Sequence, residues 1–197
     1  LAGTLTQAQV NSSIARLDTG DFVIVGGSLN NGNAVAEPNL FNPAAGTFAA
    51  LTAQIARTSA AVASKGSEVL VAGGQSAVGS LENSTEVYSN GSFAQGVLLS
   101  DARSEATATV NGGQIALIGG KDNNGPSAVV EKLDGASLGQ ATVSLGNPLA
   151  IARHAHSSTL IGNNIVLVIG GYDVSGTAIA SVEAVDLAAV PATTGTI

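Results

Sequence analysis

The sequence predicts an all-β protein built from four consecutive antiparallel sheets of four strands each. Three observations support this prediction. An apolar segment that ends in two glycines occurs four times along the 197 residues. The same order of charged, apolar and turn residues recurs around each occurrence. The hydrophobic residues, 45% of the chain, are mainly Val, Ile, Leu and Ala, with no Trp or Met, and β-branched residues favour strands.

The glycine doublets mark the ends of four central strands. They are Gly26–Gly27, Gly73–Gly74, Gly119–Gly120 and Gly170–Gly171. Their first residues are separated by 47, 46 and 51 positions, and such periods are typical of proteins built from stacked repeats. Glycine adopts backbone conformations that other residues avoid, so a doublet lets the chain bend where neighbouring sheets crowd together.

The second period illustrates the expected order of elements. It predicts four strands, at residues 57–64, 68–74, 84–89 and 92–97, of which 68–74 is the central strand with its doublet. They are connected by a turn at 65–66, a hairpin at 75–80 and a tight turn at 90–91. The tight turn is Asn90-Gly91, a pair that favours the positive φ values of a two-residue hairpin loop. A sheet this small must be covered by others, so one copy is unstable alone.

An arginine upstream of each doublet fixes the phase of the repeats. Arg57, Arg103 and Arg153 lie 16, 16 and 17 residues before the first glycine of their doublets. Arg16 lies only ten residues before Gly26, so Gln9 takes the arginine position and Arg16 belongs to the turn between the first two strands. The expected repeats are about 6–48, 49–93, 94–138 and 139–197, in a single region over residues 1–197.

The arginines vary together with an acid downstream of the doublet. The combinations are Arg57 with Glu86, Arg103 with Glu131, and Arg153 with Glu183. The first period has Gln9 and Asn39 at these places, so both charges are absent together. We therefore predict a semi-buried, hydrogen-bonded ion pair within or next to each sheet, because a buried charge is costly without its partner. The alternative is a ring of arginines that binds an anionic ligand.

These features together resemble the kelch repeat, and the resemblance covers essentially the whole chain. In that repeat an acid-x-aromatic unit and a later Trp follow the glycine doublet. The aromatic is kept by Phe41 and Tyr88 and replaced by Leu133 and Val185. The Trp position holds, in order, Phe48, Phe93, Leu138 and Ile197. The resemblance implies a β-propeller in which the four-stranded sheets are the blades.

The number of repeats bears on closure of such a ring. Propellers have about four to eight blades, and kelch-like rings more often have six or seven. We therefore expect this chain to form part of a larger ring or of a longer protein. The family includes copper-radical oxidases similar to galactose oxidase, which need a cysteine-crosslinked tyrosine. The chain has no Cys and only two Tyr, which excludes that activity.

The loops after the doublets are rich in Asn, Asp and Gly, residues that suit tight turns. The segment DNNG at 122–125 lacks the ligand spacing of an EF-hand, so turn formation is the favoured interpretation over calcium binding. Exposed loops on a rigid scaffold are nevertheless where binding concentrates. The candidate contact edge consists of Asn30, Asn31, Asp122, Asn123, Tyr172 and Asp173.

The only two histidines are His154 and His156, in the segment RHAH. On a strand this spacing places both on one face, where they would supply two metal ligands. Zinc normally takes three or four protein ligands, so a structural role is favoured and we predict no metal site and no cofactor. The chain has no nucleophile-elbow motif, so we name no catalytic residue, although the sequence leaves a Ser-His-Asp arrangement open.

Charge and composition exclude several classes of partner. The net charge is −7 with seven Lys and Arg and no basic stripe, which argues against nucleic acid and anionic lipid. No apolar run approaches the roughly 20 residues that span a bilayer, so we expect no direct membrane insertion. The absence of Cys excludes disulfides.

The function expected from these observations is a non-catalytic protein-interaction or structural scaffold module, with protein partners and a place in a larger assembly. Acidity, abundant small polar residues and a first residue other than Met favour an extracellular or cell-surface location in a bacterium. The alternative is an enzyme or carbohydrate-binding propeller whose axial site is completed by residues outside this chain. Convergent His, Asp or Tyr side chains at the axis would favour the alternative, and small, apolar filling would favour the scaffold.

Overall fold

The computed structural model describes residues 3–53, 55–162 and 164–189. The all-β part of the predicted fold class is confirmed, with 46% of residues in strands and 2% in helix. Within the described ranges, no helix has the length and apolar character needed to cross a bilayer.

Four main antiparallel sheets follow one another along the chain. The first sheet contains β1 (Ser13–Arg16), β2 (Phe22–Val25), β3 (Asn39–Asn42) and β4 (Thr47–Ala50). The second contains β6 (Ala61–Lys65), β7 (Glu68–Ala72), β9 (Thr85–Ser89) and β10 (Ser92–Gln95). The third contains β11 (Thr107–Asn111), β12 (Gln114–Ile118), β15 (Val130–Asp134) and β16 (Thr142–Leu145). The fourth contains β17 (Ser157–Gly162), β18 (Ile165–Ile169) and β19 (Val182–Asp186).

Short elements lie between the main strands. Two-residue strands pair in the loops: β5 (Arg57–Thr58) with β8 (Gln75–Ser76), and β13 (Lys121–Asp122) with β14 (Gly125–Pro126). The tight turn at Asn90-Gly91 has the expected positive φ values of 50° and 87°. Arg16 is the last residue of β1 and pairs with Phe22, so it precedes the turn instead of lying in it.

The third repeat differs from the expectation near Leu138. The repeat alignment matches Leu138 with Phe93, which lies in β10, but residues 138–140 form a 3₁₀ helix, η1 (Leu138–Gln140), and β16 starts at Thr142. Leu138 is buried in the core between the second and third sheets. Glu68 holds this segment by accepting hydrogen bonds from the Ser137 hydroxyl (2.9 Å) and the Leu138 N–H (2.8 Å). The third sheet consequently extends past residue 138, the expected repeat end.

The fourth sheet has three strands among the described residues. The sequence expectation for its closing phrase, at residues 193–197 and including Ile197, lies outside those residues.

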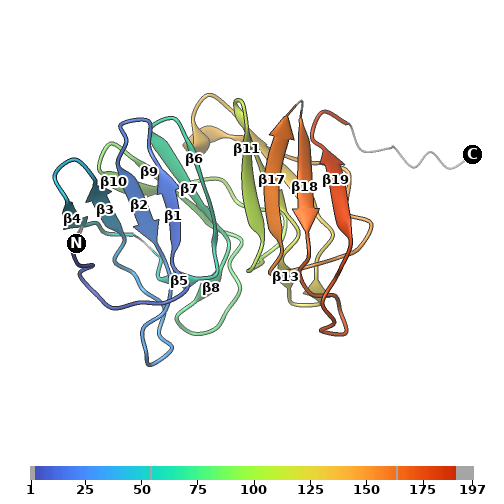
Figure 1. Ribbon diagram of the computed structural model, residues 1–197, viewed down its shortest axis with the longest axis horizontal. Coiled ribbons are helices and arrows are strands. Elements are labelled where there is room, and N and C mark those ends of the chain that lie inside the picture. Colours follow the sequence, from blue (N-terminus) through green and yellow to red (C-terminus); the bar gives the residue numbers. More distant parts are fainter. Residues whose placement is uncertain (1–2, 54, 163, 190–197) are drawn as a thin grey trace, which may run out of the picture.

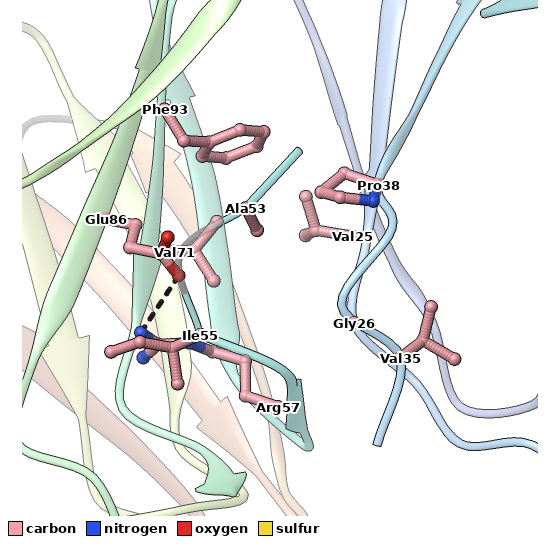
Figure 2. Close-up of a pocket in the computed structure, with 10 residues that line it drawn as sticks. All are labelled: Val25, Gly26, Val35, Pro38, Ala53, Ile55, Arg57, Val71, Glu86 and Phe93. Atoms are coloured by element: carbon pink, nitrogen blue, oxygen red, sulfur yellow. Dashed lines mark hydrogen bonds and ion pairs between the residues drawn. The ribbon is translucent and has the colours of Figure 1, made fainter. Parts of the chain in front are cut away.

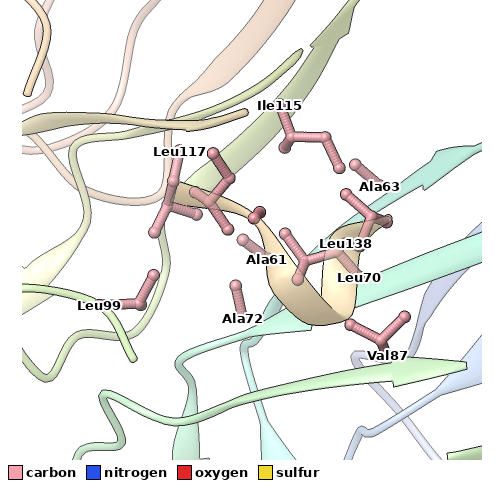
Figure 3. Close-up of a cluster of buried hydrophobic side chains, with 11 residues drawn as sticks. Ala61, Ala63, Leu70, Ala72, Val87, Leu99, Ile115, Leu117 and Leu138 are labelled. Atoms are coloured by element: carbon pink, nitrogen blue, oxygen red, sulfur yellow. The ribbon is translucent and has the colours of Figure 1, made fainter. Parts of the chain in front are cut away.

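Hydrophobic clusters fill the space between successive sheets. Residues of β12 alternate between two of them: Ile115 and Leu117 pack with the second sheet, while Ala116 and Ile118 pack with the fourth. Figure 3 shows the first of these clusters, in which side chains from β6, β7 and β12 point toward one another. The central strands of the second and third sheets are therefore buried on both faces, whereas β2 and β18 show one buried and one partly exposed face.

The sheets form an open series. The first strands of successive sheets contact one another in the order β1, β6, β11 and β17. The first sheet lies at one end of the molecule and the fourth at the other (Figure 1). Among the described residues the sheets do not close into a barrel or a propeller ring.

A line of left-handed residues runs beside the first strands. Asn11, Ser59, Glu105 and Ala155 have φ values of 57°, 52°, 55° and 51°, and each lies two residues after Gln9 or one of the buried arginines. The Glu105 N–H donates to the Ser59 carbonyl (2.9 Å), and the Ala155 N–H donates to the Glu105 carbonyl (3.1 Å). These residues thus link neighbouring sheets through their main chains.

Candidate functional site

The structure brings together all three predicted arginine–glutamate pairs. Arg57 lies 3.0 Å from Glu86, Arg103 lies 2.7 Å from Glu131, and Arg153 contacts Glu183. All three arginines are buried. Burial lowers the pKa of Arg57, and the nearby Glu86 carboxylate opposes that shift. Both side chains help to line a cavity of about 10 Å³ between the first and second sheets, and Figure 2 shows their ion pair among the other lining residues.

Each guanidinium also binds main-chain carbonyls of its own sheet. Arg57 Nη1 donates to the carbonyls of Gly73 (2.6 Å) and Ser84 (3.0 Å). Arg153 Nη1 donates to those of Gly170 (3.0 Å) and Ser181 (3.2 Å). The side chain therefore connects the end of the central strand to the start of the next strand, and a carboxylate neutralises it there.

The main chain of the arginine belongs to the preceding sheet. The Arg103 N–H donates to the Glu82 carbonyl (3.1 Å), and the Arg103 carbonyl accepts from the Gly74 N–H (2.7 Å). Arg153 makes the equivalent bonds with Ser127 (3.1 Å) and Gly120 (2.9 Å). We call this unit an arginine joint: main-chain bonds to one sheet and side-chain bonds to the next.

The first glycine of each doublet makes room for the joint. A Cβ on Gly119, where φ is +59°, would lie 2.7 Å from the Arg153 carbonyl oxygen, and one on Gly26 would lie 2.7 Å from that of Arg57. Side chains do not fit at such distances. Gly170 has the same left-handed backbone, with φ +69°, but its nearest neighbour would be 3.8 Å away. Inter-sheet packing thus explains the first glycine of the first three doublets.

The first repeat contains no joint of this kind. Asn39 is fully buried and accepts a hydrogen bond from Thr6 Oγ1 (3.2 Å), while its own amide donates to the Glu37 carbonyl (3.3 Å). Gln9, at the arginine position, has a buried side-chain amide with no hydrogen-bond partner in the described part of the chain. Loss of both charges in this repeat leaves no buried ion.

The six loop residues of the predicted contact edge divide into turn formers and surface groups. Asn31 Oδ1 accepts from the Asn33 N–H (3.0 Å) and Asp122 Oδ1 from the Asn124 N–H (2.6 Å), so both close local turns. Asp173 Oδ1 accepts from Ser175 Oγ (2.6 Å) and from the Thr177 N–H (2.9 Å). The Ser175 hydrogen bond is the main reason that the pKa of Asp173 is lowered. Asn30 and Asn123 are exposed.

A polar hollow of about 310 Å³ opens between the loops of the second and third sheets. Its walls include Gln75, Glu105, Lys121, Asp122 and Asn123. Cationic, anionic and amide groups therefore converge at this edge, beside the exposed turn residues. Asp122 and Asn123 of the predicted edge belong to this hollow, whereas Asn30 and Asn31 lie in the loop of the first sheet.

A histidine cluster continues the same edge toward the fourth sheet. His154 Nδ1 lies 2.6 Å from Glu105 Oε2, and the rings of His154 and Tyr172 are 5.8 Å apart. Tyr172 also pairs with His154 through main-chain hydrogen bonds and is 46% exposed. Sequence reasoning missed Glu105, Lys121 and Gln75, because only the fold places these loop residues together.

A second hollow, of about 350 Å³, lies beside the first strands of all four sheets. Its lining is mostly Ala, Ser and Thr, with one titratable side chain, His156. His156 is buried, with Nε2 3.0 Å from Thr107 Oγ1. Burial, and then the nearby Arg153 charge, lower the pKa of His156 to about 4.

The two histidines do not form the predicted one-faced pair. Ala155 between them is left-handed, so residues 154–156 are not a regular strand. His154 binds Glu105 and His156 binds Thr107. Within residues 3–53, 55–162 and 164–189, no three His, Cys, Asp or Glu side chains gather in a way that would hold a metal ion.

Comparison with known proteins gives no relative: no protein-family model and no curated protein matches this chain.

Proposed function

We propose that the chain is a kelch-like β-propeller arc that acts as a non-catalytic protein-interaction or scaffold module. The sheets are its blades, and the first strands line its axis. Three features support this fold: the glycine doublets, the meander order of the strands, and the side-by-side contacts of β1, β6, β11 and β17. We assign the module to the extracellular or cell-surface space on the basis of its acidity and composition.

The observation that carries the function is the contrast between the two hollows. The axial hollow is lined mainly by small side chains, with His156 bonded to Thr107, so it offers few groups for chemistry. The loop-edge hollow gathers Lys121, Glu105 and Gln75 from three loops, one of which is closed by the Asp122 carboxylate. Such a surface suits recognition of a polar protein segment that carries both charge signs, because exposed loops on rigid sheets bind without large ordering costs.

The test is selection of peptide ligands against the immobilised chain, followed by mapping of their binding. We expect selected peptides to shift the amide NMR signals of residues 75–81, 104–105 and 121–124. The double variant Lys121→Ala/Asn123→Ala should weaken binding at least about tenfold, as for central contact residues of an interface. The control is Ser67→Ala, in an exposed turn of a different hairpin. Equal binding by both variants and the wild type would contradict the proposal.

A further inference from the structure

The outer face of the first sheet is an aromatic surface that no other described sheet covers. Strand alternation and pairing register place on it Ile14, Arg16, Phe22, Ile24, Phe41 and Phe48. The opposite face, with Val23 and Val25, packs on the second sheet. The rings of Phe41 and Phe48 stack with centroids 4.6 Å apart, and Ile14 is 60% exposed.

The equivalent aromatic pair of the second sheet shows what such a surface does. Tyr88 and Phe93 occupy the same register as Phe41 and Phe48, with ring centroids 5.3 Å apart. They are only 4% and 8% exposed, because they belong to the core shared with the first sheet. The first sheet therefore repeats, on its outer face, the surface with which the second sheet docks.

The outer face of the fourth sheet is the opposite half of such an interface. It carries Ile165, Leu167, Ile169, Val182 and Ala184, on strands whose other face packs on the third sheet. Leu167 and Ile169 precede their glycine doublet by the same numbers of residues as Ala116 and Ile118 precede theirs. Ala116 and Ile118 are buried against the following sheet. Ile169 is 42% and Val182 54% exposed.

Main-chain groups at the two ends also match the halves of an arginine joint. The Ile179 carbonyl lies beside Gly170 as the Ser127 carbonyl lies beside Gly119. Gly170 keeps the left-handed φ that elsewhere admits an arginine carbonyl, yet nothing comes closer than 3.8 Å to its added Cβ. At the other end of the described sheets, Gln9 occupies the arginine position, and its side-chain amide has no hydrogen-bond partner among the described residues.

The charges on the two outer faces are complementary. Among the strand residues that point to these faces, Arg16 is the charged residue of the first sheet and Asp186 that of the fourth. Both lie at the ends of their sheets remote from the doublets. A like-charged pair at this place would have opposed docking of one face on the other.

We propose that a second copy of this chain covers these faces head to tail, with the fourth sheet of each copy packed on the first sheet of the other. Two copies of four sheets make eight, within the range of about four to eight blades for propellers. The contact continues an interface that already occurs three times inside the chain. This inference deepens the proposed propeller arc but rests on sheet packing alone, so it survives failure of the loop-edge binding test.

The first experiment is measurement of the mass in solution over a wide range of concentrations by sedimentation equilibrium. The wild type is expected at twice the chain mass of 19.2 kDa. Ile14→Lys and Ile169→Lys should each raise the dissociation constant at least about tenfold, because each places a charge at a buried interface. Val174→Lys, in an exposed loop away from both faces, is the matched control and should leave the mass unchanged.

The second experiment mixes the two variants. Ile14→Lys disrupts the first-sheet face and Ile169→Lys disrupts the fourth-sheet face. In a dimer of either variant alone, both contacts between the copies therefore include one disrupted face. The mixture keeps one intact contact and should form a two-copy species. Far-UV circular dichroism checks that both variants remain folded, as their exposed positions suggest. A wild-type chain that stays monomeric, or grows without limit, overturns the proposal, and so does a dimer that either variant leaves intact.

Discussion

At the scale of single residues, every buried arginine meets a carboxylate and main-chain carbonyls of its sheet. Arg103 Nη2 lies 2.7 Å from Glu131, whose carboxylate also accepts from Ser100 Oγ (2.9 Å) and the Ser100 N–H (3.1 Å). Removal of one partner leaves the other charge inside the core. Removal of both leaves only neutral groups, which is the state of the first repeat.

We expect Glu131→Gln to lower the free energy of unfolding by up to about 3–5 kcal/mol, because the buried Arg103 then keeps only the exposed Asp101 carboxylate, 3.8 Å away, as a counter-charge. The double variant Arg103→Gln/Glu131→Gln should lose less than the sum of the two single changes. Urea unfolding of the three variants measures the coupling. Strict additivity would show that the two side chains do not act as a pair.

The left-handed residues store backbone strain that glycine would release. Ala155 is exposed and has φ 51°, a conformation costing an L-residue about 1–2 kcal/mol. We expect Ala155→Gly to stabilise the protein by up to about 1 kcal/mol in thermal unfolding, after the entropy of glycine is subtracted. Ala63→Gly, in β6, is the control and should destabilise instead; a loss of stability at both positions would contradict the strain argument.

His156 makes stability depend on pH. Its pKa is about 4 in the folded protein and 6.5 in the unfolded chain, so unfolding takes up a proton between these values. Its contribution is complete above pH 6.5 and is lost as the pH falls toward 4, by about 3 kcal/mol in all. Carboxylates also titrate in this range, so the measurement compares urea unfolding of wild type and His156→Gln. Parallel pH curves for the two proteins would refute the assignment.

Residue-level prediction succeeded where repeats could be compared. In the first repeat Gln9 and Asn39 replace both the arginine and the glutamate, which indicated that each arginine pairs with its glutamate. The observed contacts agree with this prediction. The left-handed positions gave no such signal, because Asn, Ser, Glu and Ala share no side-chain property that marks them. Their conformation follows from hydrogen bonds between sheets, which no local pattern contains.

At the scale of elements, the doublet and the arginine of the next sheet form one packing unit. Gly74 and Gly120 donate their N–H groups to the carbonyls of Arg103 and Arg153, and the first glycine of each doublet leaves space for that carbonyl. The apolar strand before the doublet then presents alternate residues to the two neighbouring cores. Strand, bend and inter-sheet bond are therefore specified by one short segment.

Gly119→Ala is expected to destabilise the protein by more than about 2 kcal/mol, because its Cβ would lie 2.7 Å from the Arg153 carbonyl at a φ of +59°. Gly170→Ala has the same backbone strain but open space, so for the monomer it should cost only about 1 kcal/mol. Chemical unfolding of both variants in the Ile14→Lys background isolates this difference. Equal losses would mean that strain alone, and not the carbonyl contact, requires glycine.

Element boundaries were predictable where turn chemistry was strong. Asn90-Gly91 fixed the hairpin between β9 and β10, and the glycine doublets fixed the central strands. The alignment of Leu138 with Phe93 did not indicate the 3₁₀ helix at residues 138–140, which burial of Leu138 and its bond to Glu68 stabilise. Glu68 is 70 residues away, so the sequence pattern around Leu138 contains no trace of this contact.

At the scale of the whole molecule, neighbouring sheets stabilise one another in series. The second and third sheets are covered on both faces, and the first and fourth on one. In native-state hydrogen exchange on the Ile14→Lys variant, amides of β7 and β12 should exchange slowest and those of β2 and β18 faster, as expected for repeat arrays. Uniform protection across the four central strands would instead indicate a single all-or-none unit.

The candidate site at the loop edge was only partly predictable. Asp122, Asn123 and Tyr172 were chosen because exposed loops bind, and the structure places them near a polar hollow or the His154–Glu105 contact. Glu105 could not be found in this way, since it follows the arginine and not a doublet. Its position depends on how the second, third and fourth sheets stand beside one another.

Because the joints at Arg103 and Arg153 present the same two halves, neighbouring sheets meet there through the same set of main-chain and side-chain bonds. Duplication of a segment such as 59–104 would add a unit that already matches both neighbours. The number of sheets is therefore a quantity that gene duplication changes in whole steps, while the chemistry of the contact between neighbouring sheets stays constant.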